Sequence, residues 1–500
     1  MSRIVVYAHC DRTRQVYNEG GKFLNSDVRK KPVNVVFIMT DQQNVNTLGC
    51  YGNPVIRTPN IDRIASEGVV FEKAYVTTPV CVPSRASIWS SRHPHCNGVM
   101  VNDGGQRNIR LEPEITTLGD VAKAAGYACG YIGKWHIGHE QTPQHGFTDA
   151  WWTQLRGSYE QELQEGGDYA FAPAKAPPAL NTRLAQRGEV PFELAHDTAV
   201  ASRTIDFIRQ NADRPFVAVC SMRAPHDPYI GPFDDLYDPA DVLLPETLHE
   251  SFAGKPALQQ RGIPRQWFQQ WATHKDGSIN ETGLRQIIAR YWGMVHLVDQ
   301  NVGRVLGVLD ELALAENTIV VYMSDHGEMM GAHGLMAKGC FMYEEATRVP
   351  LLMRLKGHIP GGVRSANLAS AIDVVPTLLD LMGIGKPDAM QGVSLRQYWD
   401  YAFNVRDAVF MQIWETYGLF DPILAVRTDR WKYSWHLADI DELYDLHEDP
   451  LEKVNLATDR RNEEALRGLR GRITDWLVET GDISVSALSR VHKGFNKTFG

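Results

Sequence analysis

A cysteine, a proline and an arginine are closely spaced in the stretch TTPVCVPSRASIWSS, residues 77–91. Pro83 is suited to the first turn of a helix, because the N–H that proline lacks would have no intrahelical partner there. The stretch therefore predicts a helix that begins near Cys81, whose side chain would lie at the positive end of the helix dipole. Arg85 follows four residues later, so both side chains can bind one anion. A lone cysteine is more often a small buried residue, but this context favours a reactive group at an anion site.

Acidic and polar side chains stand at the ends of two apolar segments. VNVVFIM leads to Asp41, and TIVVYMS leads directly to Asp325 and His326. Ligands bind at the carboxyl ends of strands in open α/β sheets, so neighbouring strands would bring these side chains together. Two carboxylates in contact repel each other unless a proton or a cation lies between them. Each aspartate alone could instead cap a helix, but the pair together with the cysteine predicts a divalent metal site, to which Gln42 can add an amide oxygen.

Continuous apolar runs predict the elements that position these residues. Such runs are typical of strands buried on both faces of a parallel sheet, and they recur at residues 33–39, 215–222, 318–324 and 349–355. Helical periodicity separates them, and its longest pattern extends from about Leu284 to Leu314. Strands that alternate with helices predict an α/β fold, with a large, mixed but mostly parallel sheet sandwiched by helices.

Two long regions interrupt this alternation. Residues 140–195 and 227–283 are rich in proline, glycine, tryptophan and charge, which is typical of surface insertions. Insertions on a rigid scaffold often determine specificity. We therefore expect these regions to contribute to substrate selection.

The character of the chain changes near residue 385. Segments 408–413 and 423–435 are short and alternating, which predicts antiparallel strands, and a helix is predicted from about Arg461 to Glu479. The predicted organisation has three parts: an N-terminal extension (1–32), a catalytic α/β domain (33–385) and a smaller α+β domain with a short antiparallel sheet (386–500).

Composition limits the class of protein. The chain has 500 residues, 43% of them hydrophobic and 22% charged, as in ordinary soluble globular proteins, and its formal net charge is −9. An acidic total argues against nucleic acid as the main partner, and no run approaches the roughly 18 apolar residues of a membrane span. The apolar piece Ile4–Ala8 is too short for a secretory signal. The seven cysteines have no CxxC metal spacing. We therefore expect a cytoplasmic protein.

The CVPSR motif at residues 81–85 resembles the signature of the type I sulfatases, which belong to the alkaline phosphatase-like superfamily. Further motifs, in the order of that family, extend the resemblance over nearly the whole chain. They are TDQQ at 40–43, TPNIDRIASEGVVFEKAYV at 58–76, GYIGKWHIG at 130–138, APHDP at 224–228, SDHGEMMGAHGLMAKGCFMYEEATRVPLLMR at 324–354, AIDVVPTLLDLMGI at 371–384 and ELYDLHEDPLEKVNLA at 442–457. Each motif alone is weak, whereas all of them in order are highly specific.

The resemblance implies a modified nucleophile and a metal ion. Cys81 would be converted after translation to formylglycine, an aldehyde whose hydrate attacks the sulfate ester. A single divalent metal ion would be held by Asp41, Gln42, residue 81, Asp325 and His326. Sulfate esters are anions, so their charge must be neutralised before attack, which a metal ion and several cations do.

The resemblance also implies roles for five further side chains. Arg85 would hold the hydrate, and Lys134 would contact both the hydrate and the sulfate. His136 would help to deprotonate the second hydroxyl of the hydrate when sulfate is released. Lys338 and His226 would hold sulfate oxygens and support the leaving group.

Two positions depart from the usual family pattern and leave alternatives open. The family often has aspartate where Gln42 stands and asparagine where His326 stands. An all-oxygen site suits Ca²⁺, the preferred ion here, whereas imidazole favours Mn²⁺ as the alternative. Phosphonate monoester hydrolases of the same superfamily also use an Asp-His pair, so a phosphonate monoester hydrolase or phosphodiesterase is the main alternative function. The CVPSR form and the Lys134/His136 motif favour a sulfatase.

A non-catalytic binding protein on a sulfatase scaffold is the second alternative. The presence of every expected site residue argues against it. The expected partners are a small aryl, alkyl or carbohydrate sulfate and a formylglycine-generating enzyme for maturation, while oligomerisation is left open. The natural substrate is not predicted, because the insertions contain no recognisable motif.

Overall fold

The structure is a computed structural model, and it describes residues 32–102, 109–138, 143–152, 190–400 and 404–481. The predicted N-terminal extension, up to residue 31, and much of the first predicted insertion lie outside these residues. The predicted division near residue 385 stays a prediction. In the part of the chain that is described, no helix is both long and apolar enough to cross a membrane, and a cytoplasmic location also stays a prediction.

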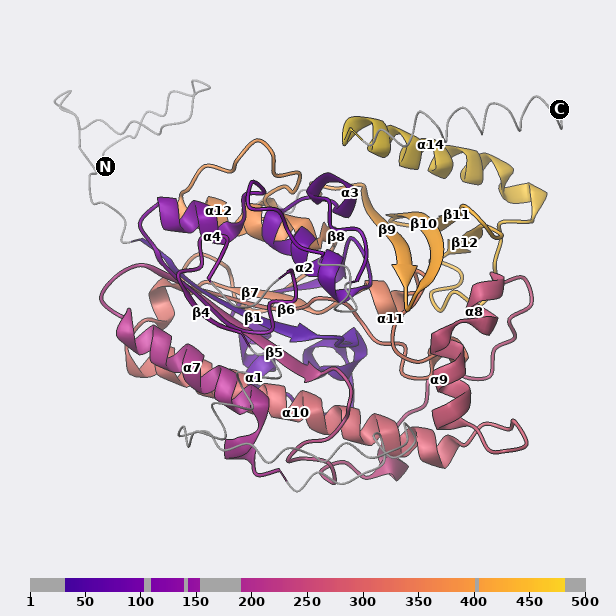
Figure 1. The fold of residues 1–500 in the computed structure, drawn as a ribbon, viewed down its shortest axis with the longest axis horizontal. Coiled ribbons are helices and arrows are strands. Elements are labelled where there is room, and N and C mark those ends of the chain that lie inside the picture. The colour runs from indigo at the N-terminus through magenta and orange to yellow at the C-terminus, as the bar shows by residue number, and fades with distance from the viewer. Residues whose placement is uncertain (1–31, 103–108, 139–142, 153–189, 401–403, 482–500) are drawn as a thin grey trace, which may run out of the picture. The chain divides into compact units, whose positions relative to one another are not determined.

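An eight-stranded sheet forms the centre of the fold (Figure 1). Its strands are β1 (Asn34–Asp41), β2 (Val69–Tyr75), β3 (Ala128–Gly133), β4 (Asp149–Trp152), β5 (Phe216–Pro225), β6 (Thr318–Ser324), β7 (Leu351–Arg354) and β8 (Val363–Ser370). Their order in the sheet is β4-β3-β5-β1-β6-β7-β2-β8. Only β7 runs antiparallel to its neighbours among the described pairings, so the sheet is mixed but mostly parallel, as predicted.

Helices cover both faces of this sheet. The described helices are α1 (Pro59–Ser66), α2 (Cys81–Ser90), α3 (Pro94–Asn97), α4 (Leu118–Ala124), α7 (His196–Gln210), α8 (Ala257–Arg261), α9 (Ile263–Ala272), α10 (Glu281–Glu311), α11 (Glu344–Thr347), α12 (Val374–Met382), α13 (Gln397–Asp400) and α14 (Glu463–Glu479). Short 3₁₀ turns connect several of them. In Figure 1, α7 and α10 lie on one side of the sheet, and α2, α4 and α12 lie on the other.

The alternation of side chains along β1 explains why both faces need a cover. Val36 and Ile38 belong to the core beneath α1, α7 and α10. Val35, Phe37 and Met39 point the other way, into the core beneath α2, α4 and α12. Because successive residues of a strand face opposite sides, an uninterrupted apolar run can be buried only between two layers. The prediction of a sheet sandwiched by helices is therefore confirmed.

A second, four-stranded antiparallel sheet follows in the C-terminal part. It contains β9 (Ala408–Thr416), β10 (Leu419–Thr428), β11 (Trp431–His436) and β12 (Glu442–Asp445), in the order β12-β11-β10-β9. One face packs against α14, through Leu469, Ile473 and Trp476 of that helix. The other face packs against Tyr75, Val80 and Cys340 of the large domain. The small sheet is thus joined to the segment that precedes Cys81 and to the segment that follows Lys338.

Two predicted segments differ in detail from the observed strands. Residues 423–435, predicted as strand throughout, contain the end of β10, a turn and the start of β11. Residues 349–355 contain β7 (Leu351–Arg354), which is antiparallel rather than one more parallel strand. An apolar run reports burial on both faces, but it does not report strand direction.

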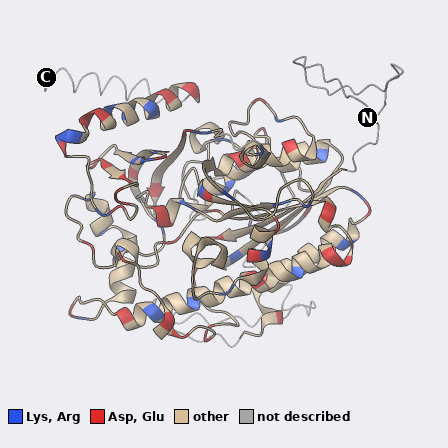
Figure 2. Cartoon of the chain, turned by 180° about the vertical axis from the view of Figure 1, so that it is seen from behind, with Lys and Arg blue, Asp and Glu red and all other residues tan. Residues whose placement is uncertain are grey.

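Charged residues are distributed over the described elements without segregation by sign. Figure 2 shows basic and acidic residues interspersed along the helices, including the C-terminal α14. The formal net charge of −9 is therefore a property of the total rather than of one strongly acidic face in this view.

Candidate active site

The carboxyl ends of β1 and β6 lie side by side, because these strands pair in parallel with Thr40 opposite Ser324. Asp41 ends β1, and Asp325 follows β6 directly. Ligand atoms of four buried side chains lie within 4.8 Å of one another at this edge: Asp41, Cys81, Asp325 and His326. The structure thus brings together four of the five predicted metal ligands.

Helix α2 begins at Cys81, as the position of Pro83 predicts. The Cys81 Sγ lies 3.0 Å from His326 Nε2 and 3.9 Å from Asp41 Oδ1. The Val82 N–H at the same helix end donates to Asn102 Oδ1 over 3.0 Å, so this backbone donor is already satisfied. The first turn of the helix therefore presents the Cys81 side chain, rather than that N–H, to the cluster.

Arg85 links the two aspartates from the second turn of α2. Its Nε donates to Asp325 Oδ2 over 2.7 Å, and one terminal nitrogen donates to Asp41 Oδ2 over 3.1 Å. The other terminal nitrogen donates to the Lys134 carbonyl and to Ser221 Oγ, over 2.6 and 2.9 Å. The side chain is fully buried. Arg85 is therefore held rigidly by carboxylates and a strand end, and it faces the same cluster as Cys81.

Lys134 and His136 follow β3 at the same edge of the sheet. The Lys134 N–H donates to the Ser221 carbonyl over 2.9 Å, which anchors the segment to β5. Its ammonium forms an ion pair with Asp41 Oδ2. His136 has a φ of 59°, and a hydrogen bond from its side chain helps to stabilise the Cys81 thiolate. Both residues thus approach Cys81 from the end of β3, whereas Asp325 and His326 approach it from the end of β6.

Lys338 and His226 form a second cationic group beside the cluster. The Lys338 ammonium lies 3.2 Å from His226 Nε2 and also donates to Gln42 Oε1. His226 Nδ1 lies 2.8 Å from the carbonyl oxygen of Asp227. Lys338 is buried, whereas the His226 side chain is 21% exposed. His226 therefore lies between the buried cluster and solvent, where a substrate would enter.

Gln42, the fifth predicted metal ligand, is held by neighbours in the structure. Its Nε2 donates to Glu328 Oε2, and its backbone N–H donates to Asp325 Oδ1 over 3.1 Å. Glu328 also accepts from the N–H groups of Met330 and Ala337. Glu328 thus orients Gln42 so that its amide oxygen faces Lys338. A ligand role for Gln42 stays a prediction.

Opposing electrostatic effects act on Cys81. Burial alone would raise the pKa of its thiol, but Lys338, His326 and Lys134 outweigh burial and hold this pKa well below its usual range. Burial, followed by the charge of Asp41, raises the pKa of Asp325. The site therefore favours negative charge at residue 81 and resists two bare carboxylates side by side.

The donor set fits one divalent cation. Two carboxylates supply the oxygen ligands that Ca²⁺ and Mn²⁺ accept, and His326 adds an imidazole nitrogen. A cation between the aspartates would relieve the repulsion that raises the pKa of Asp325. The four-residue cluster is the only group of this kind among the described histidine, cysteine and acidic residues.

Sequence reasoning did not identify two residues that contact or face this cluster. Ser221 lies within β5 and accepts from Arg85, but a buried serine in an apolar run gives no signal in one sequence. Tyr417 lies at the turn between β9 and β10 and acts on the pKa of Lys338. Its only signal is the pair Tyr-Gly between two alternating segments, which predicts a turn and not its location.

Family comparisons match almost the whole described region. A sequence model of the family described as Sulfatase matches residues 33–384. A second, described as N-sulphoglucosamine sulphohydrolase, C-terminal, matches residues 331–479. The first match alone covers more than half of the chain.

Alignments with individual relatives cover most of this chain and most of each relative. The chain is 32% identical over 470 residues to an uncharacterised sulfatase, YidJ, of Escherichia coli strain K12, which covers 91% of this chain and 88% of that protein. It is 28% identical over 489 residues to an N-acetylglucosamine-6-O-sulfatase of Bacteroides thetaiotaomicron, covering 85% of this chain and 83% of that protein.

Solved structures show the same architecture. A 2-O GAG sulfatase superimposes with a TM-score of 0.72 at 26% identity, covering 91% of this chain and 94% of that chain. A phosphonate monoester hydrolase of Agrobacterium radiobacter superimposes with a TM-score of 0.75 at 23% identity, covering 90% of this chain and 96% of that chain. At this identity the second likeness concerns the fold alone.

Proposed function

The chain belongs to the formylglycine-dependent sulfatase family of the alkaline phosphatase-like superfamily and is a sulfuric ester hydrolase, and we propose that Cys81 is the precursor of its formylglycine. The observation that carries this proposal is the location of the Cys81 thiol. The thiol lies at the start of α2, 3.0 Å from His326. Burial raises its pKa, but Lys338, His326 and Lys134 outweigh burial and hold this pKa well below its usual range. A nucleophile that must attack an anion needs such surroundings.

We assign the metal ion to Asp41, Asp325 and His326, together with residue 81 and Gln42. The two carboxylates and the buried imidazole converge on one point. Calcium is the proposed ion, and manganese is the alternative because of the nitrogen ligand. A divalent ion would supply positive charge to an oxygen of the sulfate group and to the attacking hydroxyl.

The cationic side chains divide into two groups by location. Lys134 and Arg85 form ion pairs with Asp41, whereas Lys338 contacts Gln42 and His226. Three terminal oxygens of a sulfate monoester can be bound between these groups. Lys134, Lys338 and His226 would hold those oxygens, and Arg85 would fix the residue-81 side chain.

His136 is suited to accept a proton. Burial, followed by the charge of Lys134, lowers its pKa to about 4. The imidazole is therefore neutral near pH 7, as a general base must be. Because its side chain hydrogen-bonds residue 81, we propose that it takes a proton from that residue during sulfate release.

The substrate class proposed is a small carbohydrate or aryl sulfate. A relative that is 28% identical is named N-acetylglucosamine-6-O-sulfatase, which supports a sulfated sugar. The phosphonate monoester hydrolase is similar in fold only, so a phosphonate or phosphodiester is the second candidate.

The test is to produce the chain together with a formylglycine-generating enzyme and analyse the peptide that contains residue 81 by mass spectrometry. We expect conversion of Cys81, hydrolysis of an aryl sulfate, and loss of that activity in Cys81→Ala with unchanged thermal stability. Cys50→Ala, at a half-buried cysteine outside the cluster, is the control. Activity of Cys81→Ala close to wild type would overturn the proposal.

A further inference from the structure

The turn between β9 and β10 contains a tyrosine in an unfavourable backbone conformation. Tyr417 and Gly418 connect the strands, with φ values of 56° and 78°. Positive φ at both central positions is the geometry of a type I′ turn, which strongly prefers Asn-Gly or Gly-Gly. Tyrosine is costly in the left-handed region, and such residues cluster at ligand-binding sites. The turn therefore retains an aromatic ring where backbone geometry favours a small residue.

The hairpin places this turn beside the catalytic segments. The Gln412 N–H of β9 donates to the Thr77 carbonyl over 2.8 Å, four residues before Cys81. Apolar side chains of β9 pack against Val80 and Cys340, which flank Cys81 and Lys338 in the sequence. The hairpin is therefore anchored to the segment before Cys81 and to the segment after Lys338.

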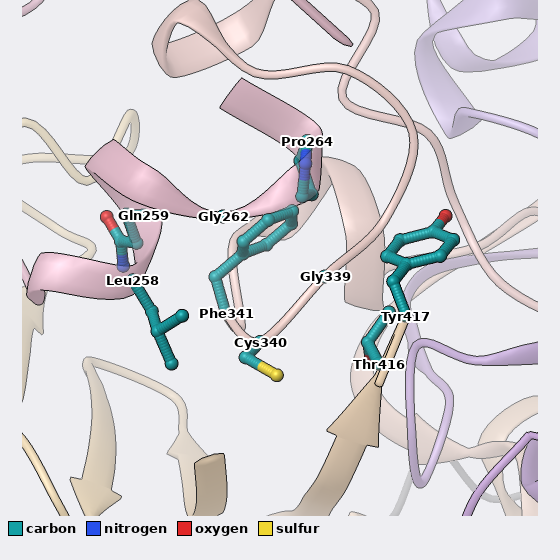
Figure 3. A pocket seen from close by; sticks show the side chains of 9 residues that line it. All are labelled: Leu258, Gln259, Gly262, Pro264, Gly339, Cys340, Phe341, Thr416 and Tyr417. Carbon is teal, nitrogen blue, oxygen red and sulfur yellow. The ribbon is translucent and has the colours of Figure 1, made fainter. Parts of the chain in front are cut away.

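Tyr417 lies close to the segment that follows Lys338, because Tyr417, Gly339 and Cys340 line the same small cavity (Figure 3). Burial raises the pKa of Tyr417, while Lys338 acts to lower it and Asp227 and Cys81 raise it further. Together with the shared cavity wall, the effect of Lys338 indicates that the phenol lies near this ammonium. Tyr417 nevertheless keeps 38% of its surface exposed. It thus lies near Lys338, one of the cations that would hold sulfate, and is also open to the solvent from which a substrate would arrive.

Two tryptophans of α9 extend this aromatic surface. Trp267 contacts Tyr417 with ring centroids 4.8 Å apart and planes at 70°. Trp271, one turn later, stacks on Trp267 at 5.2 Å and 11°. The turn and helix border a cavity of about 10 Å³ with Pro264 and Phe341 (Figure 3), room for about one water molecule. The small volume of this cavity leaves little empty space behind Tyr417.

We propose that Tyr417 and Trp267 form one wall of the subsite for the group esterified to sulfate, and that this group is an uncharged ring with an apolar face, either a pyranose or an aryl ring. The inference rests on the proposed sulfatase function. Two rings at 70° offer a corner in which a flat substituent contacts one face and one edge. Lys338 beside Tyr417 disfavours a positively charged substituent there.

Specificity for rings is tested by the ratio of kcat/KM for 4-nitrophenyl sulfate or N-acetylglucosamine 6-sulfate, whose rings carry no positive charge, to that for ethyl sulfate. Tyr417→Asn removes the ring and suits the turn, because Asn-Gly is preferred in type I′ geometry. For the better ring substrate, we expect this ratio to fall about tenfold, mainly because KM rises. Such a change corresponds to the loss of roughly one aromatic contact. Trp267→Leu should lower it in the same direction. Phe420→Asn, at a 67% exposed ring of the same hairpin, is the matched control and should leave the ratio unchanged.

The outcomes distinguish this inference from the proposed function. If converted wild-type enzyme hydrolyses sulfate esters but Tyr417→Asn leaves the ratio unchanged, the subsite is wrong and the function stands. If wild type prefers choline sulfate and Tyr417→Asn removes that preference, the wall binds a quaternary ammonium group and the ring assignment is overturned. If converted, metal-bound wild type hydrolyses no sulfate ester, both proposals fail.

Discussion

Arg85 and a metal ion would both offset the negative charge of Asp41 and Asp325. The guanidinium already donates to Asp325 and Asp41, from a fully buried position. Removing either carboxylate would leave buried positive charge without its partner, which is strongly destabilising. Substitutions at this site therefore need variants that keep size and hydrogen bonding while they change charge.

Asp325→Asn is such a variant and should weaken metal binding and activity together. The amide retains an oxygen but loses the negative charge, so we expect metal affinity and kcat/KM to fall by about a hundredfold or more, beyond typical losses for outer-shell partners. Metal content by mass spectrometry and turnover of an aryl sulfate measure both. Asp206→Asn, at an exposed position of α7, is the control. Full activity of metal-free enzyme would contradict the metal assignment.

Lys134→Ala should reduce the preference for sulfate over phosphonate. A sulfate monoester has three terminal oxygens for cations to hold, whereas a phosphonate monoester has two and a second substituent. Lys134 would hold one of these oxygens from its position beside Asp41. We expect wild type to favour an aryl sulfate over the matching phenylphosphonate, and the variant to lose sulfate turnover first.

Measuring both ester classes on one preparation decides this prediction. A clear wild-type preference for the phosphonate would favour the alternative function. An unchanged ratio in Lys134→Ala would place the discrimination elsewhere in the site.

Site residues that belong to sequence motifs are predictable from the sequence, whereas residues that reach the site only through long-range packing are not. Asp41, Asp325 and Cys81 were expected to meet, because strand ends and a helix start have sequence signals, and their ligand atoms lie within 4.8 Å of one another. Tyr417 was not expected there. Its position depends on how the C-terminal hairpin packs against the large sheet, and no local pattern encodes such long-range packing.

At the scale of elements, a buried histidine and its two carboxylate partners connect strands of the small sheet and make its stability depend on pH. His436 of β11 lies 3.0 Å from Glu442 of β12 and 3.5 Å from Asp421 of β10. Burial lowers the pKa of His436, but these carboxylates outweigh burial and raise it to about 9. A raised histidine pKa stabilises the fold fully below the unfolded value of about 6.5, and this contribution is lost as pH rises through about 9.

We therefore expect the thermal stability of wild type to fall between pH 6.5 and 9.5. His436→Gln should flatten this dependence by on the order of 1 to 3 kcal/mol. The exposed His447→Gln is the matched control. Thermal unfolding across this pH range, combined with hydrogen exchange of β10 to β12, measures the effect. An equal slope in wild type and His436→Gln would show that His436 and its carboxylate partners do not contribute to the pH dependence of stability.

The elements themselves were predictable where periodicity is strong. The segment from Leu284 to Leu314 closely matches α10, and TIVVYMS coincides with β6. The turn inside 423–435 was missed, because Asp429 and Arg430 separate two strands whose side-chain alternation continues across the turn. Hydrogen bonding between strands, rather than polarity, determines that boundary.

At the scale of the whole molecule, a buried lysine joins the small sheet to the catalytic layer. Lys432 of β11 forms ion pairs with Glu344 of α11 and Glu452, over 2.8 and 2.7 Å, and its side chain is fully buried. Burial raises the pKa of Glu452 to about 7, against the lowering effect of Lys432. Without this cation, two carboxylates would face each other between the sheets.

Lys432→Met should lower the free energy of unfolding by about 3 to 5 kcal/mol at pH 8, because a buried charge pair loses one partner. The loss should be smaller at pH 5.5, where Glu452 is protonated. Chemical denaturation at both pH values measures it, and the half-exposed Lys453→Met is the control. A loss that is equal at both pH values would contradict the role of Glu452.

The anchoring of the hairpin on Thr77 and Val80 would limit when Cys81 can be modified. Cys81 is only 2% exposed in the folded chain, so an enzyme that converts it would have to reach it before the C-terminal strands fold against Thr77 and Val80. Roughly 300 further residues must be synthesised first, which takes on the order of 15 to 60 s at ordinary translation rates. Slower elongation would therefore lengthen the interval for modification, and refolding a complete chain would shorten it.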